Sequence, residues 1–316
     1  MKEKNTNTKQ YLYYDEDQID FRELFFILLK AKWIILSVTA FISILGVIYS
    51  LSLPNIYESR ALLARVDSSE SIASSMTGSA IANLAGVNIP SSDENSNSSK
   101  AIKKISSLSF FQNNILPNIN LPDLMAVKVW NPKTNELVFK KNIYDSKNST
   151  WIREFSYPQR QIPSAQESFN VFRKKHLIIS EDEKSGFITV SIKHQSPFVA
   201  KQWVELIINE VNNFYREKER LEAERSSSYL NQQISMNNLS EINEVLASLL
   251  QEEIKKLTLI EASKFYVFDY IDPPAIMEEK SEPKRALICI LISLFGFIFS
   301  IPLVFIRYYI SNKKVN

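Results

Sequence analysis

The side chains that most often carry chemistry in proteins are scarce in this sequence. It contains two histidines, His176 and His194, and one cysteine, Cys289, which lies within an apolar run. A single cysteine excludes an intrachain disulfide and a cluster of thiol ligands, and two histidines are too few for most histidine-based metal sites. We therefore expect structural or surface roles for the histidines, and we predict neither a metal nor a cofactor.

Motifs for nucleotide, hydrolase or calcium chemistry are also absent from the sequence. With 5 glycines in 316 residues, it has no GxxxxGK[ST], GxGxxG, GxSxG or HExxH motif. The acidic run at residues 181–183 lacks the spacing of a calcium loop and is typical of a solvated turn. We predict no catalytic residue and no enzyme, although glycosidase carboxylates have no short motif and stay an alternative. A formal net charge of +2 without a basic domain gives no indication of a nucleic-acid partner.

Two long apolar runs, one near each end, must anchor whatever lies between them. Residues 33–53 and 286–306 contain no charged side chain. Each run has about 21 residues, which is enough for a helix across a hydrocarbon core of ~30 Å. Backbone groups in lipid must bond internally, so we predict two transmembrane helices rather than two buried core helices. The first run starts too late for an ordinary cleaved signal peptide.

Basic residues beside the two runs predict their orientation. Lysines and arginines lie in both tails, at residues 1–32 and 307–316. Such residues are enriched in short cytoplasmic segments, so we expect both tails in the cytoplasm and residues 54–285 outside it. Lys284 and Arg285 oppose this orientation at the outer end of the second run, but long basic side chains can extend to the interface.

The middle segment predicts an α+β domain. Its expected elements are a first strand, a short helix, a β-hairpin, a long helix and an aromatic return strand. They lie at residues 56–66, 102–115, 177–193, 197–264 and 265–272. Residues 91–99 are typical of a loop. The first and last strands each adjoin an apolar run, so we expect them close together in one sheet.

The long helix is predicted from a stretch without glycine or proline. Ser196 is a typical N-cap, Pro197 suits the first helical position, and apolar residues then recur at helical spacing. A continuous helix to about Lys264 would be on the order of 100 Å long. Residues 216–228 are charged on nearly all sides, which favours a solvated helix; the alternative is a charged wall facing a shared cavity.

Four short segments, in order, are similar to those of one known family. Two flank the first apolar run, at residues 20–35 and 54–59, and a third is the return strand with its exit, at residues 261–274. The fourth is a proline motif that leads into the second run. With these segments the chain resembles the Wzz-type chain-length determinants, also called class 1 polysaccharide co-polymerases.

The proline motif of that family is Pro-x2-Pro-x4-Ser-Pro-Lys-x-Ala, followed by glycines within the helix. The matching residues are Pro274, Pro283, Lys284, Ala286 and Gly296. Met277 and Glu282 stand in place of the second proline and the serine. The resemblance implies membrane-helix contacts at this motif, and the pairs Gly46–Ser50 and Gly296–Ser300 have the small-xxx-small spacing of close helix packing.

The resemblance implies a function without catalysis. It predicts an α+β protein of the bacterial inner membrane, with two terminal transmembrane helices, a periplasmic base and one very long helix. Copies would form a homo-oligomeric ring that sets the length of O-antigen lipopolysaccharide or a related glycan. The implied partners are an O-antigen polymerase, the lipid-linked glycan and membrane lipids. Candidate length-modulating residues are Arg216, Arg220 and Arg225, together with the helix tip at 226–239.

Other classes of protein remain as alternatives. A capsule or exopolysaccharide co-polymerase or export component often carries a kinase, yet no Walker A motif is present and the Tyr11, Tyr13 and Tyr14 cluster is too weak to imply one. A periplasmic sensor would need a signalling domain after residue 306. A periplasmic glycan-processing enzyme is the fourth alternative. Deletion of the gene would separate these classes by its effect on polysaccharide length.

Overall fold

The computed structural model describes residues 21–66 and 97–313. The chain forms two compact units: Met1–Leu53 with Pro283–Asn316, which we call the helix-pair unit, and Pro54–Glu282, which we call the sheet unit. Most of the predicted loop at residues 91–99 and the predicted tyrosine cluster lie outside the described residues.

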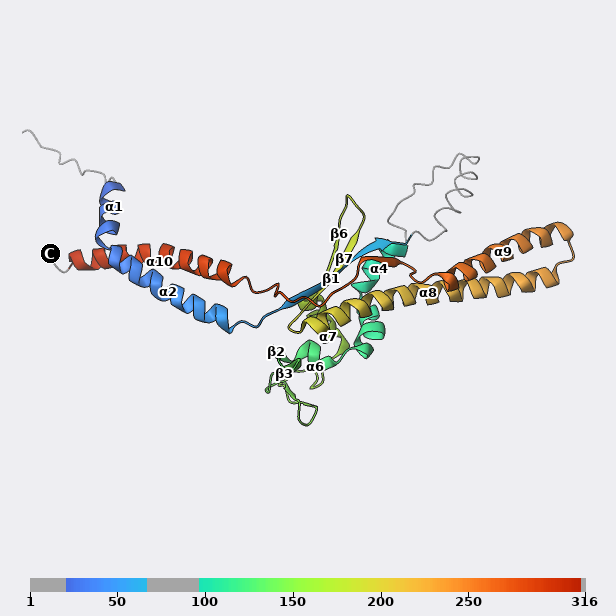
Figure 1. The fold of residues 1–316 in the computed structure, drawn as a ribbon, viewed down its shortest axis with the longest axis horizontal. Coiled ribbons are helices and arrows are strands. Elements are labelled where there is room, and N and C mark those ends of the chain that lie inside the picture. Colours follow the sequence, from blue (N-terminus) through green and yellow to red (C-terminus); the bar gives the residue numbers. More distant parts are fainter. Residues whose placement is uncertain (1–20, 67–96, 314–316) are drawn as a thin grey trace, which may run out of the picture. The chain divides into compact units, whose positions relative to one another are not determined.

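The helix-pair unit consists of α1 (Phe21–Lys30), α2 (Lys32–Ser52) and α10 (Arg285–Lys313). Here α2 and α10 pack along one another and contain the two predicted apolar runs (Figure 1). Both are long and apolar enough to cross a membrane, by length and composition alone. Their outward faces expose large apolar side chains, including Phe41 and Phe295.

The sheet unit is built on an antiparallel sheet with the strand order β6–β7–β1–β8. These strands are β1 (Tyr57–Arg65), β6 (Leu177–Glu181), β7 (Ile188–His194) and β8 (Phe268–Asp272). The predicted hairpin is confirmed by the pairing of β6 with β7, and the first and return strands are neighbours as expected. Ile188, Val190 and Ile192 alternate along β7 and are fully buried, which gives the sheet one apolar face.

Short helices and two small hairpins occupy the segment between β1 and β6. The helices are α4 (Asn97–Ile105), α5 (Leu108–Phe110), η2 (Phe111–Ile115), η3 (Leu116–Asn118), α6 (Leu121–Met125), α7 (Ala165–Val171) and η4 (Phe172–His176). The hairpins pair β2 (Val127–Asn131) with β3 (Glu136–Phe139), and β4 (Tyr144–Asp145) with β5 (Thr150–Trp151). The single helix predicted at residues 102–115 is divided, because the Ser107 hydroxyl accepts a hydrogen bond from the Phe110 amide and starts a new helical turn.

The long helix α8 (Pro197–Met236) covers the sheet. It begins as predicted, since the Ser196 hydroxyl accepts a hydrogen bond from the Val199 amide and Pro197 occupies the first turn. It packs against β1 and β7, and its residues Ile207, Ile208 and Val211 are fully buried there. This apolar stripe at helical spacing fixes which face of α8 meets the core.

The prediction of one continuous helix to about Lys264 is wrong. The chain leaves the helical conformation at Asn237, and α9 (Ser240–Ala262) runs back beside α8 (Figure 1). The side-chain amide of Asn237 donates to the Gln233 carbonyl at 2.9 Å, and the side-chain amide of Asn243 donates to the Asn237 carbonyl at 2.9 Å. Asparagine side chains that bond the backbone in this way end helices without glycine or proline.

Candidate functional site

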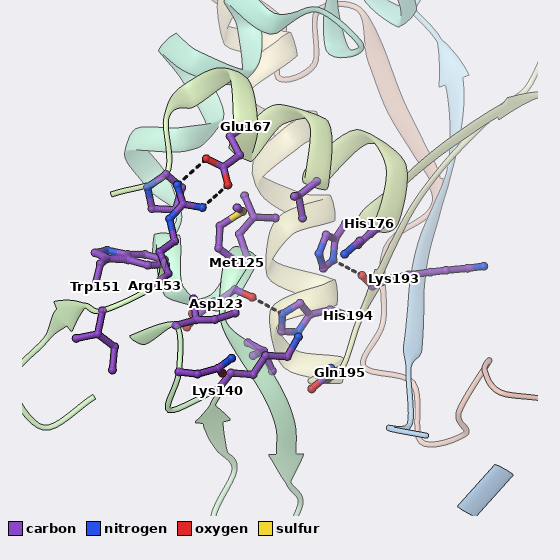
Figure 2. A pocket seen from close by; sticks show the side chains of 18 of the residues that line it. Asp123, Met125, Lys140, Trp151, Arg153, Glu167, His176, Lys193, His194 and Gln195 are labelled. Carbon is purple, nitrogen blue, oxygen red and sulfur yellow. Dashed lines mark hydrogen bonds and ion pairs between the residues drawn. The ribbon is translucent and has the colours of Figure 1, made fainter. Parts of the chain in front are cut away.

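A cavity of about 870 Å³ opens in the sheet unit. Figure 2 shows its walls, which come from α6, the segment after β5, α7, η4 and the end of β7. Its volume lies within the range of ~300–1,000 Å³ that small-molecule sites occupy. Elements far apart in the sequence meet here, so the cavity exists only in the folded unit.

The two histidines form one wall of the cavity, and their polar atoms are engaged by the backbone. His194 Nδ1 accepts from the Ser196 amide at 3.0 Å, so Nε2 carries the proton and donates to the Asp123 carbonyl at 3.0 Å. His176 Nδ1 donates to the Lys193 carbonyl at 2.7 Å. The rings lie 5.6 Å apart, and Trp203 of α8 packs against both. These contacts give the histidines a structural role.

The environment keeps both imidazoles neutral. Burial, reinforced by the neighbouring His194 ring, lowers the pKa of His176 from 6.5 to about 4. Burial also lowers the pKa of His194, although its bonds with Asp123 and Ser196 act in the opposite direction. Burial raises the pKa of the Asp123 carboxyl at the same wall. Groups of three or more histidine, cysteine, aspartate or glutamate side chains suited to a metal do not occur among the described residues.

An ion pair supports the opposite wall. Arg153 forms two hydrogen bonds with the Glu167 carboxylate, one of them 2.8 Å long, and its Nε donates to the Gln161 carbonyl at 2.9 Å. Glu167 lies in the first turn of α7, which Ser164 caps through the Glu167 amide. Bidentate pairing fixes the orientation of both side chains, so Arg153 connects the segment after β5 to α7.

No motif in the sequence indicated this cavity. Its wall residues are separated by long stretches of chain, and the two histidines were its only members that the sequence analysis singled out. Their arrangement does not resemble a catalytic pair, because their polar atoms bond backbone groups rather than one another. The two histidines therefore support the wall of the cavity.

The three candidate length-modulating arginines lie elsewhere and differ in environment. Arg216 donates to the carbonyls of Ser263 and Lys264, both at 2.7 Å, and so closes the C-terminal end of α9. Arg220 pairs with Glu217 and Glu224 on its own helix. Arg225 is exposed and forms no ion pair within residues 21–66 and 97–313.

The charged segment of α8 also contains a buried acid that the sequence analysis missed. Glu219 is 8% exposed; its carboxylate lies 2.9 Å from Lys256 of α9 and accepts a hydrogen bond of 2.6 Å from Asn97 of α4. Ala223, one turn later, is buried on the same face. That i,i+4 spacing was the available signal that one side of this charged stretch faces α9.

The residues of the proline motif divide between the two units. Pro274 is buried, and next to it the Ala275 carbonyl accepts a 2.8 Å hydrogen bond from Ser59 of β1. Glu282, which replaces the motif serine, pairs with Lys193 at 2.6 Å. In the helix-pair unit, Pro283 is partly buried, whereas Lys284 and Ala286 are exposed.

Small residues line the contact between α2 and α10. A Cβ atom added at Gly46 would lie 2.6 Å from Ile292, and one added at Gly296 would lie 3.0 Å from Ile42. The hydroxyls of Ser43 and Ser293 are 2.8 Å apart. Ser50 and Ser300, at the small-xxx-small positions, are buried. The glycines therefore permit close approach of two helices of the same chain.

One protein family matches the N-terminal third of the chain. Residues 17–113 match the family described as "Wzz: Chain length determinant protein". No curated protein sequence matches the chain at a significant level.

Two solved structures are similar to the chain at low identity. A full-length bacterial polysaccharide co-polymerase has 15% identity and a TM-score of 0.40, and the match covers 93% of this chain and 99% of that chain. A fragment of WzzB, a polysaccharide co-polymerase from Salmonella Typhimurium, has 15% identity and a TM-score of 0.31, and the match covers 72% of this chain and 100% of that chain.

Proposed function

We propose that this chain is a Wzz-type chain-length determinant and regulates surface polysaccharide length without catalysing a reaction; the match of residues 17–113 to the chain-length determinant family supports this. In this proposal it acts as a co-polymerase beside a separate polymerase, and its product is O-antigen or a related glycan. The family match is the observation that carries the proposal. The matched residues include α2, which is the first apolar helix, and β1, which is the first strand of the sheet.

The proposal places the chain in the bacterial inner membrane. We assign residues 33–53 and 286–306 to transmembrane helices, 54–285 to the periplasm, and the tails 1–32 and 307–316 to the cytoplasm. Large apolar side chains on the outward faces of α2 and α10 support this assignment, because lipid would cover them. Basic residues in the tails support the orientation.

The proposal also includes a homo-oligomer. Ile242, Val245 and Leu249 lie along α9, and all three are exposed in a single copy. An apolar stripe of this kind is typical of a protein interface, so neighbouring copies are the expected cover. A strictly monomeric mass by light scattering in detergent would contradict this part of the proposal.

Deletion of the gene tests the function directly. Surface polysaccharide from the deletion strain should still be made but should lose its modal length on a gel, and the intact gene should restore it. An unchanged ladder would contradict the proposal. A change confined to capsule or exopolysaccharide, with normal lipopolysaccharide, would favour the alternative co-polymerase class.

A further inference from the structure

We propose that the cavity of the sheet unit binds a short segment of saccharide. The inference rests on the proposed function for the source of the sugar. Its volume of about 870 Å³ is sufficient for a few sugar rings, and its walls combine charged, amide, aromatic and aliphatic side chains (Figure 2). The chemistry of these side chains narrows the ligand class in three steps.

The first step is charge balance. The charged residues that line the cavity are Lys140, Arg153, Lys175, Lys193, Asp123, Glu154 and Glu167. Glu167 neutralises Arg153, and Glu282, which does not line the cavity, neutralises Lys193. Two lysines and two carboxylates then remain, and the histidines are neutral. A balanced site of this kind does not favour a multiply charged ligand such as a nucleotide or a phosphate.

The second step is unused hydrogen-bonding capacity. The Glu154 carboxylate lines the cavity and is exposed. Lys140 and Asn142 reach the cavity from the exposed segment between β3 and β4. The cavity therefore offers acceptors and donors together. Sugar hydroxyls donate and accept hydrogen bonds at once, whereas a fatty acyl chain can form no hydrogen bond with these groups.

The third step is an aromatic wall. Trp151 of β5 lines the cavity, and its ring is held by Tyr144 of β4 at a centroid distance of 5.2 Å. Figure 2 shows the Trp151 side chain next to Arg153. A fixed ring beside hydrogen-bonding groups suits a ligand with one apolar face and polar edges. A sugar ring, with C–H groups on a face and hydroxyls at its rim, has that form.

The test is a binding measurement on the full-length protein in detergent. The probe is the oligosaccharide mixture released by mild acid from the surface polysaccharide of the strain that carries the gene, followed by saturation-transfer NMR. We expect saturable binding to the wild type. Trp151→Ala and Lys140→Ala should each weaken it about tenfold, because each removes a contact with the sugar.

Matched controls separate the cavity from the rest of the surface. Lys133→Ala removes an exposed lysine from the β2–β3 turn, and Tyr229→Ala removes an exposed aromatic from α8. Both should bind like the wild type. Absence of binding at millimolar oligosaccharide, or equal binding by all variants, would overturn the inference. If gene deletion still alters polysaccharide length, the proposed function survives and only the cavity assignment fails.

Discussion

The chain contains two helix pairs that are held together in different ways. In α2 and α10, glycines allow close approach, and the hydroxyls of Ser43 and Ser293 form a hydrogen bond between the helices. In α8 and α9, a buried carboxylate meets a lysine, and an arginine closes a helix end. The contacts described for the first pair join small and uncharged side chains, whereas those of the second pair include an ion pair.

The difference shows how sequence composition limits the means of packing. Apolar side chains on every face give α2 and α10 no preferred inner side, so small residues must create one. Beyond the sheet most faces of α8 and α9 are polar, and the buried Ala223 and Ile260 share this contact with the ion pair of Glu219 and Lys256. Each pair should therefore fail under a different kind of substitution.

Removal of the buried acid should have the largest effect. Glu219→Ala leaves Lys256 and Asn97 without their carboxylate, and loss of one partner of a largely buried pair costs about 3–4 kcal/mol. Urea unfolding, followed at α8 and α9 by hydrogen exchange, measures the loss. Glu222→Ala is the control, since its exposed pair with Lys218 should not matter. Equal behaviour of the two variants would show that charge does not organise this hairpin.

Acid should weaken the sheet unit selectively. The folded pKa of His176, about 4, lies below its unfolded value near 6.5, so the unfolded chain binds the proton first. Stability is therefore complete above pH 6.5 and falls by about 3 kcal/mol as pH decreases to 4. His194 acts in the same direction.

Unfolding by urea at pH 7 and pH 4.5 tests this prediction. The wild type should lose stability in the sheet unit, and His176→Asn should lose less. An equal loss of stability in the helix-pair unit at pH 4.5 would contradict the prediction that acid acts on the sheet unit.

Crowding the glycine contact should have an intermediate effect. Gly46→Leu places a side chain where Ile292 already lies, and overpacking of this kind costs about 2 kcal/mol. Cysteines at positions 43 and 293 report the contact, because the serine hydroxyls there are 2.8 Å apart. Their disulfide should form readily in the parent and poorly with Gly46→Leu.

The cross-linking experiment needs two controls. Cys289→Ala removes the native thiol from α10, so that only the introduced pair can react. Ala40→Leu adds the same bulk at an exposed position of α2 and should leave the cross-link intact. Efficient cross-linking in both leucine variants would mean that the glycine is not required for close approach.

Substitution of Arg216 and Arg220 by alanine should give the smallest difference in stability. Arg216→Ala frees the carbonyls at the end of α9 and should cost about 1–2 kcal/mol, because charged donors make stronger hydrogen bonds. Arg220→Ala removes exposed pairs within one helix and should leave the melting temperature unchanged. If both shifted polysaccharide length without loss of stability, the arginines would act on a partner instead.

Much of the fold follows from short-range patterns. The alternation of Ile188, Val190 and Ile192 predicted β7, and Ser196 with Pro197 predicted the start of α8. These signals are the spacing of apolar residues and the capping of a helix end, and both depend only on residues that are close in the sequence. The divided helix at residues 102–115 shows the limit, because one serine cap outweighed the apolar pattern.

The candidate site was not accessible to the same reasoning. Trp151, Arg153 and Glu167 have no motif spacing, and they meet His176 and His194 only because α7, η4 and β7 pack together. A cavity is defined by contacts between segments, so single-sequence periodicity contains no information about it.

The sequence by itself determined the two apolar helices, the return of the last strand beside the first, and the resemblance to the chain-length determinants. Only the tertiary structure decided that the long helical stretch turns at Asn237, that Glu219 is buried, and that a cavity lies beside the histidines. The physical reason is the separation in the sequence between the residues that interact. Helix and strand formation depends on residues a few positions apart, whereas burial depends on which distant surfaces exclude water together.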